Sequence, residues 1–63
     1  MTNKQIAQEL RAFAISEHVG YVGMSEPAFV LMRAYAEHGY RLYGPEDERR
    51  TFALLVAEAL ESE

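Results

Sequence analysis

Two stretches of the chain each place a glutamate beside a histidine, and these residue types can bind a metal ion or transfer a proton. The stretches are RAFAISEHVGY at 11–21 and RAYAEHGY at 33–40. Both contain an arginine-alanine-aromatic-alanine run, a Glu-His pair and a Gly-Tyr pair. Two imidazoles and two carboxylates together could bind zinc. The four candidate ligands are Glu17, His18, Glu37 and His38.

The spacing within each pair does not favour a metal site. Neighbouring residues of a helix project about 100° apart, so one Glu-His pair cannot readily chelate one ion. Neither His18 nor His38 has a second histidine four residues further on, which is the spacing that puts two imidazoles on one helix face. We therefore expect neither a metal nor a cofactor.

A structural interpretation explains the same residues as two helix ends. Gly39 can adopt the left-handed conformation that closes a helix, and Tyr40 would then contact Tyr35 one turn back. His18 and His38 would lie in last turns, where the negative end of the helix dipole favours a positive imidazole. The match between the two stretches is short, so an ancient duplication and chance both stay open.

The serines and the glycines do not point to catalysis. Ser25 has the position of a helix cap, Ser62 lies in the tail and Ser16 lies at a helix end, and no Gly-x-Ser-x-Gly stretch exists. The stretch GYVGMS lacks the lysine that a phosphate-binding loop uses. A chain of 63 residues also leaves little room for a catalytic cleft. We predict that the protein is not an enzyme.

Composition narrows the class of protein. The chain is long enough for one domain, 1–63, and a hydrophobic content of 49% argues against disorder. It has no cysteine, which excludes disulfides and thiolate metal sites and fits a reducing compartment. No apolar run approaches the roughly 20 residues that cross a bilayer, and the first residues do not resemble a signal peptide. We expect a soluble, cytoplasmic protein.

Apolar residues at helical spacing predict three helices, at about 3–17, 26–38 and 46–61. In the first helix, Ile6, Leu10 and Phe13 recur at i, i+4 and i+7, and Thr2 or Asn3 supplies the N-terminal cap. These positions give the first helix one apolar face.

The second helix opens with Ser25 as its cap and Pro27 in its first turn. Its apolar arc is centred on five residues, Ala28, Leu31, Met32, Tyr35 and Ala36. Flanking apolar residues widen this arc beyond what one neighbouring helix can cover. The second helix is therefore expected to be central or to face a second subunit.

The third helix follows Pro45, which suits a first helical turn, and three acidic residues follow where the helix dipole favours carboxylates. Glu46 and Arg50 stand at i and i+4, the spacing of a helix-surface ion pair. The predicted apolar stripe comprises Phe52, Leu55, Val56, Ala59 and Leu60.

These elements predict an all-α fold, a small three-helix bundle. A core of this size rarely supplies more than about 3–5 kcal/mol, so we expect a homodimer to complete it. The connections GYVGM and GYRLYG could also form two very short extended segments, although a two-stranded sheet alone is marginal in water.

The aromatic connections are the predicted place for a partner. Tyrosine, methionine and arginine are enriched at interfaces, and the candidate partner-binding residues are Tyr21, Met24, Tyr40, Arg41 and Tyr43. Alternation along an extended segment would turn Leu42 inward and leave Arg41 and Tyr43 exposed together. The alternative is that these tyrosines only cover the ends of the bundle.

We predict a non-catalytic protein that binds and modulates another protein as an adaptor, an inhibitor or a small regulatory subunit. The alternative is a DNA-binding regulator of the helix-turn-helix type, with Arg41, Arg49 and Arg50 as its basic patch. A net charge of −4 and three acidic residues at the start of the third helix make nucleic acid a poor partner.

Overall fold

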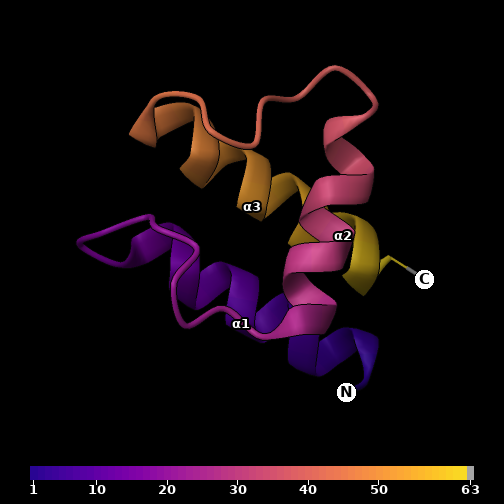
Figure 1. The fold of residues 1–63 in the computed structure, drawn as a ribbon. Coiled ribbons are helices and arrows are strands. Elements are labelled where there is room, and N and C mark those ends of the chain that lie inside the picture. The colour runs from indigo at the N-terminus through magenta and orange to yellow at the C-terminus, as the bar shows by residue number, and fades with distance from the viewer. Residues whose placement is uncertain (63) are drawn as a thin grey trace.

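The computed structural model describes residues 1–62 and folds them into three helices (Figure 1). They are α1 (Asn3–Ile15), α2 (Glu26–Ala36) and α3 (Glu46–Glu61). No strand occurs within 1–62, so the connections do not form a small sheet. The predicted all-α three-helix bundle is confirmed, while Glu63, the last residue of the predicted domain, lies outside the described residues.

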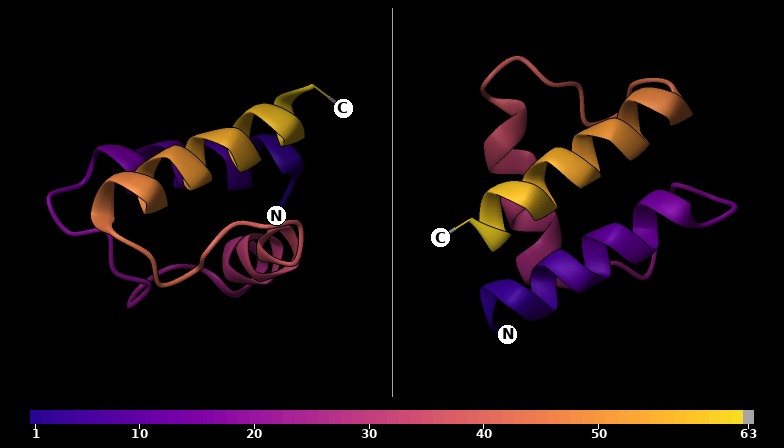
Figure 2. Two further views of the ribbon diagram at one scale, coloured as in Figure 1. Left: turned by 90° about the horizontal axis from the view of Figure 1, so that it is seen from above. Right: turned by 180° about the vertical axis from the view of Figure 1, so that it is seen from behind.

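The helices form two layers. α1 and α3 run antiparallel, and α2 crosses one face of this pair, so that it is seen nearly end-on in the view from above (Figures 1 and 2). Two loops, 16–25 and 37–45, connect the helices. Val19, Tyr21 and Leu42 from these loops are buried or packed against the core. None of the three helices, as described, is long and apolar enough to cross a membrane.

The core lies where the three helices meet. Its buried members come from all three helices and are Ile6, Ala7, Leu10, Ala14, Ala28, Met32, Phe52, Ala53, Val56, Ala57 and Leu60. Full burial of a large aliphatic or aromatic side chain stabilises a fold by about 1.5–3 kcal/mol, so these residues hold the helices together. The arc predicted on α2 is confirmed at its centre, because Ala28 and Met32 have no exposed surface.

The stripe predicted on α3 was partly wrong. Leu55 is 39% exposed, whereas Ala53 and Ala57 are fully buried. The two alanines stand one turn apart on the side of α3 that also carries Arg50 and Glu61, both of which bond to α1. Small side chains let two helices approach closely, so alanines take the place that the sequence pattern gave to leucine.

The first helix ends two residues earlier than predicted. Ser16 adopts an extended conformation (φ −72°, ψ 157°), and its Oγ lies 2.7 Å from the carbonyl oxygen of Phe13 and 2.9 Å from that of His18. This side chain competes for the carbonyl groups that a further helical turn would use. His18 therefore lies beyond the helix, and its predicted place in a last turn was wrong.

The second helix also ends two residues early, at Ala36. The N–H groups of residues 37–39 donate to carbonyl oxygens three residues back, and Gly39 has the positive φ (103°) expected of a closing glycine. His38 lies in this closing turn, after the last helical turn, with its ring against that of Tyr35. The predicted partner of Tyr40 was wrong: its ring stacks on Phe52 instead, at 5.0 Å between centroids. After this turn, the loop 37–45 leads back to the start of α3 (Figure 1).

Side chains cap the N-termini of α1 and α2 but not that of α3. Thr2 and Gln5 form a reciprocal capping box on α1, and Ser25 caps α2, as predicted. Pro45 occupies the N-cap position of α3 and offers no side-chain hydrogen bond. Three carboxylates in the first turn of α3 complement the helix dipole there.

Two charged side chains each form hydrogen bonds to the end of a neighbouring helix. The Glu9 carboxylate of α1 accepts hydrogen bonds from Ser25 N–H (2.7 Å) and Oγ (2.5 Å) at the start of α2. The Arg50 guanidinium of α3 donates from Nη1 to the carbonyl oxygens of Ala14 (2.8 Å) and Ser16 (2.6 Å) at the end of α1. Each charge has the sign that complements the helix dipole. The predicted ion pair between Glu46 and Arg50 is not among the ion pairs of residues 1–62. The Arg50 guanidinium bonds to the carbonyl oxygens at the end of α1 instead.

Candidate functional site

Tyr21 is the centre of an aromatic cluster. Its ring stacks on Phe13 of α1, with 5.5 Å between centroids and 13° between planes. It meets Phe29 of α2 edge-on at 5.4 Å and Tyr43 of the second loop edge-on at 5.5 Å. Its hydroxyl donates to the carbonyl oxygen of Leu42. One side chain of the first loop therefore contacts two helices and the second loop.

The environment of Tyr21 keeps its hydroxyl protonated. Burial raises the pKa of the Tyr21 phenol, because the phenolate loses hydration, and the nearby Tyr43 acts in the same direction. The positive charge of Arg49 opposes this effect and is outweighed. An unperturbed tyrosine already keeps its proton at physiological pH, and the raised pKa extends to higher pH the range over which the hydroxyl can donate to Leu42.

A tight turn holds Val22 in solvent. The N–H of Met24 donates to the carbonyl oxygen of Tyr21 at 3.1 Å, and Gly23 has a φ of 90°. A positive φ at the third residue is what a type II turn requires, and glycine adopts it without strain. Val22, the second residue of the turn, is fully exposed (102%). The backbone therefore presents an aliphatic side chain at the tip of the first loop.

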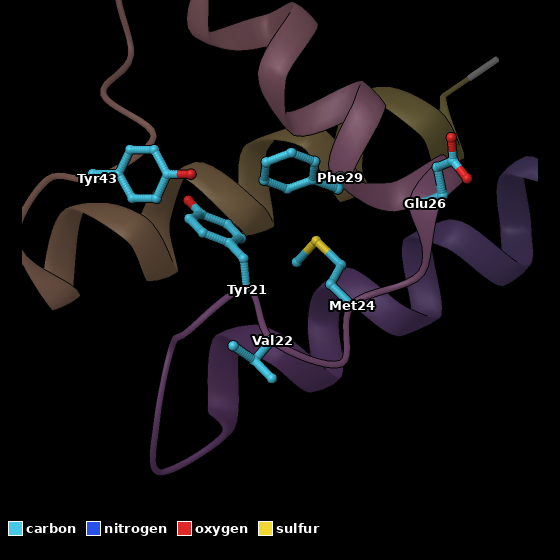
Figure 3. Close-up of a pocket in the computed structure, with 6 residues that line it drawn as sticks. All are labelled: Tyr21, Val22, Met24, Glu26, Phe29 and Tyr43. Carbon is cyan, nitrogen blue, oxygen red and sulfur yellow. The ribbon is translucent and has the colours of Figure 1, made fainter.

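A pocket of about 540 Å³ opens beside this turn, and we call it the aromatic pocket (Figure 3). Its lining residues are Tyr21, Val22, Met24, Glu26, Phe29 and Tyr43. The ring of Tyr21 lies between Tyr43 on one side and Met24 and Phe29 on the other, with Glu26 at the far end (Figure 3). Tyr43 is 77% exposed, so the pocket has a large aromatic side chain at its rim.

A second hollow of about 330 Å³ adjoins the aromatic pocket and shares Val22 and Met24 with it. Its lining residues include the polar side chains of Glu9, Ser16 and His18. The Tyr21–Met24 turn therefore borders both hollows.

The structure brings together three of the five predicted partner-binding residues: Tyr21, Met24 and Tyr43 line the aromatic pocket. Tyr40 and Arg41 do not line it. Tyr40 is 38% exposed and stacks on Phe52 of the core.

The second loop alternates sides much as its sequence predicts. Leu42 packs against the core, and Tyr43 and Arg41 are both largely exposed. Arg41 is not free, because its Nε lies 3.0 Å from a carboxylate oxygen of Glu48.

Sequence reasoning missed three lining residues. No role was predicted for Val22. It is a β-branched residue inside a glycine turn, between Tyr21 and Gly23, and this pattern is the signal that could have identified it. Phe29 is one of the apolar residues that flank the predicted arc of α2, and no role was predicted for Glu26. The apolar arc already indicated that Phe29 lay at a boundary, but only the folded chain brings it to Tyr21.

The three arginines of the alternative DNA-binding patch have different roles. Arg49 donates to the carbonyl oxygen of Val19 at 2.5 Å, and its Nε is buried without a hydrogen-bond partner. Arg50 closes α1, as described above. Arg41 remains exposed but pairs with Glu48. Two of the three guanidinium groups therefore bond to backbone carbonyl oxygens of the bundle itself.

The two Glu-His pairs do not meet. His18 lines the second hollow and His38 contacts Tyr35 at the opposite end of the second loop from Tyr43. Within residues 1–62, no group of three or more histidine or acidic side chains is placed to hold a metal ion.

Comparison of the chain with protein-family models, with curated proteins and with solved structures finds no match.

Proposed function

We propose that this protein is a non-catalytic module that binds another protein through the aromatic pocket and thereby modulates it. The observation that carries the proposal is the combination of a pocket with exposed apolar side chains, Val22 and Tyr43, at its rim. Aromatic and methionine side chains are enriched at interface cores. A role as adaptor, inhibitor or small regulatory subunit requires such a surface.

The size of the pocket supports this role. Pockets that bind small-molecule ligands commonly measure about 300–1,000 Å³, and the aromatic pocket, at about 540 Å³, lies within that range. One or two bulky side chains of a partner would fill it.

The rigidity of the pocket also supports this role. Tyr21 is held by three ring contacts and one hydrogen bond, and the Tyr21–Met24 turn is closed by its own backbone bond. A surface that is already ordered loses less conformational entropy on binding. The pocket is therefore suited to recognise a partner without refolding.

We further propose that the chain forms a homodimer and acts in the cytoplasm. Several aliphatic side chains on the helices remain partly exposed: Ile15 (83%), Val30 (44%), Leu54 (38%) and Leu55 (39%). Sedimentation at micromolar concentration is expected to give twice the chain mass of 7.2 kDa. A monomer with a concentration-independent melting transition would contradict the dimer.

The alternative, a DNA-binding regulator, has no observation in its favour. Two of its three candidate arginines, Arg49 and Arg50, donate to backbone carbonyl oxygens. A mobility-shift assay at low and high salt separates the two classes, because phosphate contacts make DNA binding strongly salt-dependent.

The test of the proposal compares two sets of substitutions. A partner captured from the source cells with the full chain is purified, and its Kd is measured for the wild type, Val22→Ser/Tyr43→Ser and Ile15→Ser. Ile15 is a matched control, because it is an exposed aliphatic that lines neither hollow. We expect the double variant to bind about 30-fold more weakly or worse, as for true anchors, and the control to bind normally.

Normal binding by the double variant would contradict the proposal and would place the interface elsewhere. Arg41→Ala and Tyr40→Ala then test whether the surface extends along the second loop, as the sequence predicts. Both substitutions are checked for unchanged melting, because Tyr40 also packs on Phe52.

A further inference from the structure

Glu26 is an unpaired carboxylate at the end of the aromatic pocket. It is exposed, it lines the pocket, and it takes part in neither of the two ion pairs found within residues 1–62. The other five lining residues are neutral, and three of them are aromatic (Figure 3). The pocket thus joins an apolar wall to one negative charge.

We propose that the occupant of the aromatic pocket is a protein segment that carries a bulky apolar side chain and, close to it, a lysine or arginine. This inference rests on the proposed function and adds the chemistry of the partner. The apolar side chain would lie among Tyr21, Met24 and Phe29, and the cation would lie at Glu26.

Charge complementarity carries the cationic half of the proposal. No lysine, arginine or histidine lines the pocket, and the whole chain has a net charge of −4. Arg33 lies over the Phe29 ring at 5.9 Å from its centroid, and the charge of Arg49 acts on Tyr21, but neither arginine lines the pocket. A cationic partner is attracted by the field of an acidic chain and gains a specific pair at Glu26.

The apolar half follows from the walls. The Tyr21 and Phe29 rings present large rigid contact areas, and the Met24 side chain can adapt to different shapes. The described chain has no strand, so a partner cannot bind by adding a strand to a sheet edge, and the side-chain walls of the pocket are the surface offered to it.

The geometry of α2 sets the spacing of the two groups. Glu26 and Phe29 stand three residues apart on one helix, about 4.5 Å along its axis, and their side chains point apart, with the Phe29 ring toward Tyr21 and the Glu26 carboxylate at the far end of the pocket (Figure 3). Lysine and arginine have long flexible side chains. In the sequence of the partner, the lysine or arginine should therefore lie within about four residues of the bulky apolar side chain. A segment with the two groups far apart in sequence would not satisfy both ends of the pocket.

The test uses the full chain as bait for a library of random peptides about twelve residues long. Selected peptides are sequenced, and their Kd values are measured at low and moderate salt with the wild type, Glu26→Gln and Glu46→Gln. Glu46 is a matched control because it is also the first residue of a helix, α3, and also lies in an acidic first turn without lining either hollow. Amide chemical shifts of the labelled chain locate the bound peptide.

We expect selected peptides to combine an aromatic or branched aliphatic residue with a nearby lysine or arginine and to shift the amides of the Tyr21–Met24 turn. Glu26→Gln should weaken them about two- to fivefold, as for an exposed charge pair, with a smaller effect at higher salt. Glu46→Gln should leave Kd unchanged.

The other outcomes separate the inference from the proposed function. Peptides that occupy the pocket but are neutral or acidic, or that bind Glu26→Gln as tightly as the wild type, overturn the inference and leave the proposed function standing. Failure to select any pocket-binding peptide overturns both. Concentration-dependent shifts of the same amides without peptide would show that a second copy of this chain fills the pocket, which also overturns the inference.

Discussion

The closure of α1 by Arg50 gives the sharpest prediction about stability. Arg50 lies on α3, yet its guanidinium donates to the carbonyl oxygens of Ala14 and Ser16, and less closely to that of Glu17 (3.5 Å). α1 has no basic residue in its own last turn. Replacing Arg50 with methionine keeps an aliphatic stem of similar reach and removes both the charge and the donors.

The expected loss is large for a domain of this size. A hydrogen bond to a charged group contributes about 1.5–3 kcal/mol, and a cation at a partly buried helix C-terminus contributes up to about 2 kcal/mol. These contributions overlap, so we expect Arg50→Met to lower the free energy of unfolding by about 2–3 kcal/mol. A chain of this length has about 3–9 kcal/mol in total, so Tm should fall by about 10–20 °C.

Urea unfolding followed by circular dichroism measures this loss. Arg41→Met is the control, because Arg41 pairs with Glu48 on the surface and such a pair contributes about 1 kcal/mol or less. Arg50→Lys keeps the charge but not the fork of donors. Its loss of unfolding free energy should therefore lie between those of Arg50→Met and Arg41→Met. If Arg50→Met were no more destabilising than Arg41→Met, the guanidinium would not be closing α1 and the reasoning would be wrong.

The remaining predictions concern Tyr21, one ion pair and one glycine. Tyr21→Phe keeps the ring contacts and loses one hydrogen bond, so we expect a loss of about 1 kcal/mol in urea unfolding; an unchanged midpoint would contradict the bond. Because the pKa of Tyr21 is raised in the folded state, its contribution is present below the ordinary tyrosine value of about 10 and is lost as pH rises through the folded pKa. Melting curves of Tyr21→Phe should therefore show a weaker alkaline decline than the wild type. The hydrogen bond from Arg11 lowers the pKa of Glu61, so this pair stabilises the fold above the ordinary carboxylate value and its contribution disappears as pH falls through the folded pKa; Arg11→Gln should be destabilising at about pH 7 but not at about pH 2. Gly39→Ala should cost about 1 kcal/mol because of its positive φ, whereas Gly20→Ala, without a positive φ and with open space for a Cβ, should cost less, and equal costs would contradict the closing role of Gly39.

Local patterns predicted the number and type of the helices. The 3.6-residue periodicity and the caps at Thr2 and Ser25 depend on residues a few positions apart, and the structure agrees with them. The early ends of α1 and α2 were missed. For α1 the cause combines a local competitor, Ser16, with Arg50, which lies more than thirty residues away.

Contacts between distant residues also explain what was missed at the candidate site. The composition of the loops singled out Tyr21, Met24 and Tyr43, because their residue types are common at interfaces. That Phe29 completes the pocket depends on how α2 crosses the α1–α3 pair, which no local spacing encodes. Tyr40 was predicted to contact Tyr35 at the end of α2, whereas in the fold its ring stacks on Phe52 of α3.

The position of Tyr21 has a consequence for how the molecule fluctuates. Its ring and hydroxyl tie the first loop to the second through Tyr43 and Leu42, while its other contacts reach Phe13 and Phe29. Segments that share such contacts open as one cooperative unit in amide hydrogen exchange. The two loops, although separated by a whole helix, should therefore exchange their amide hydrogens with similar opening free energies, and a change in either loop should alter the exchange rates of both.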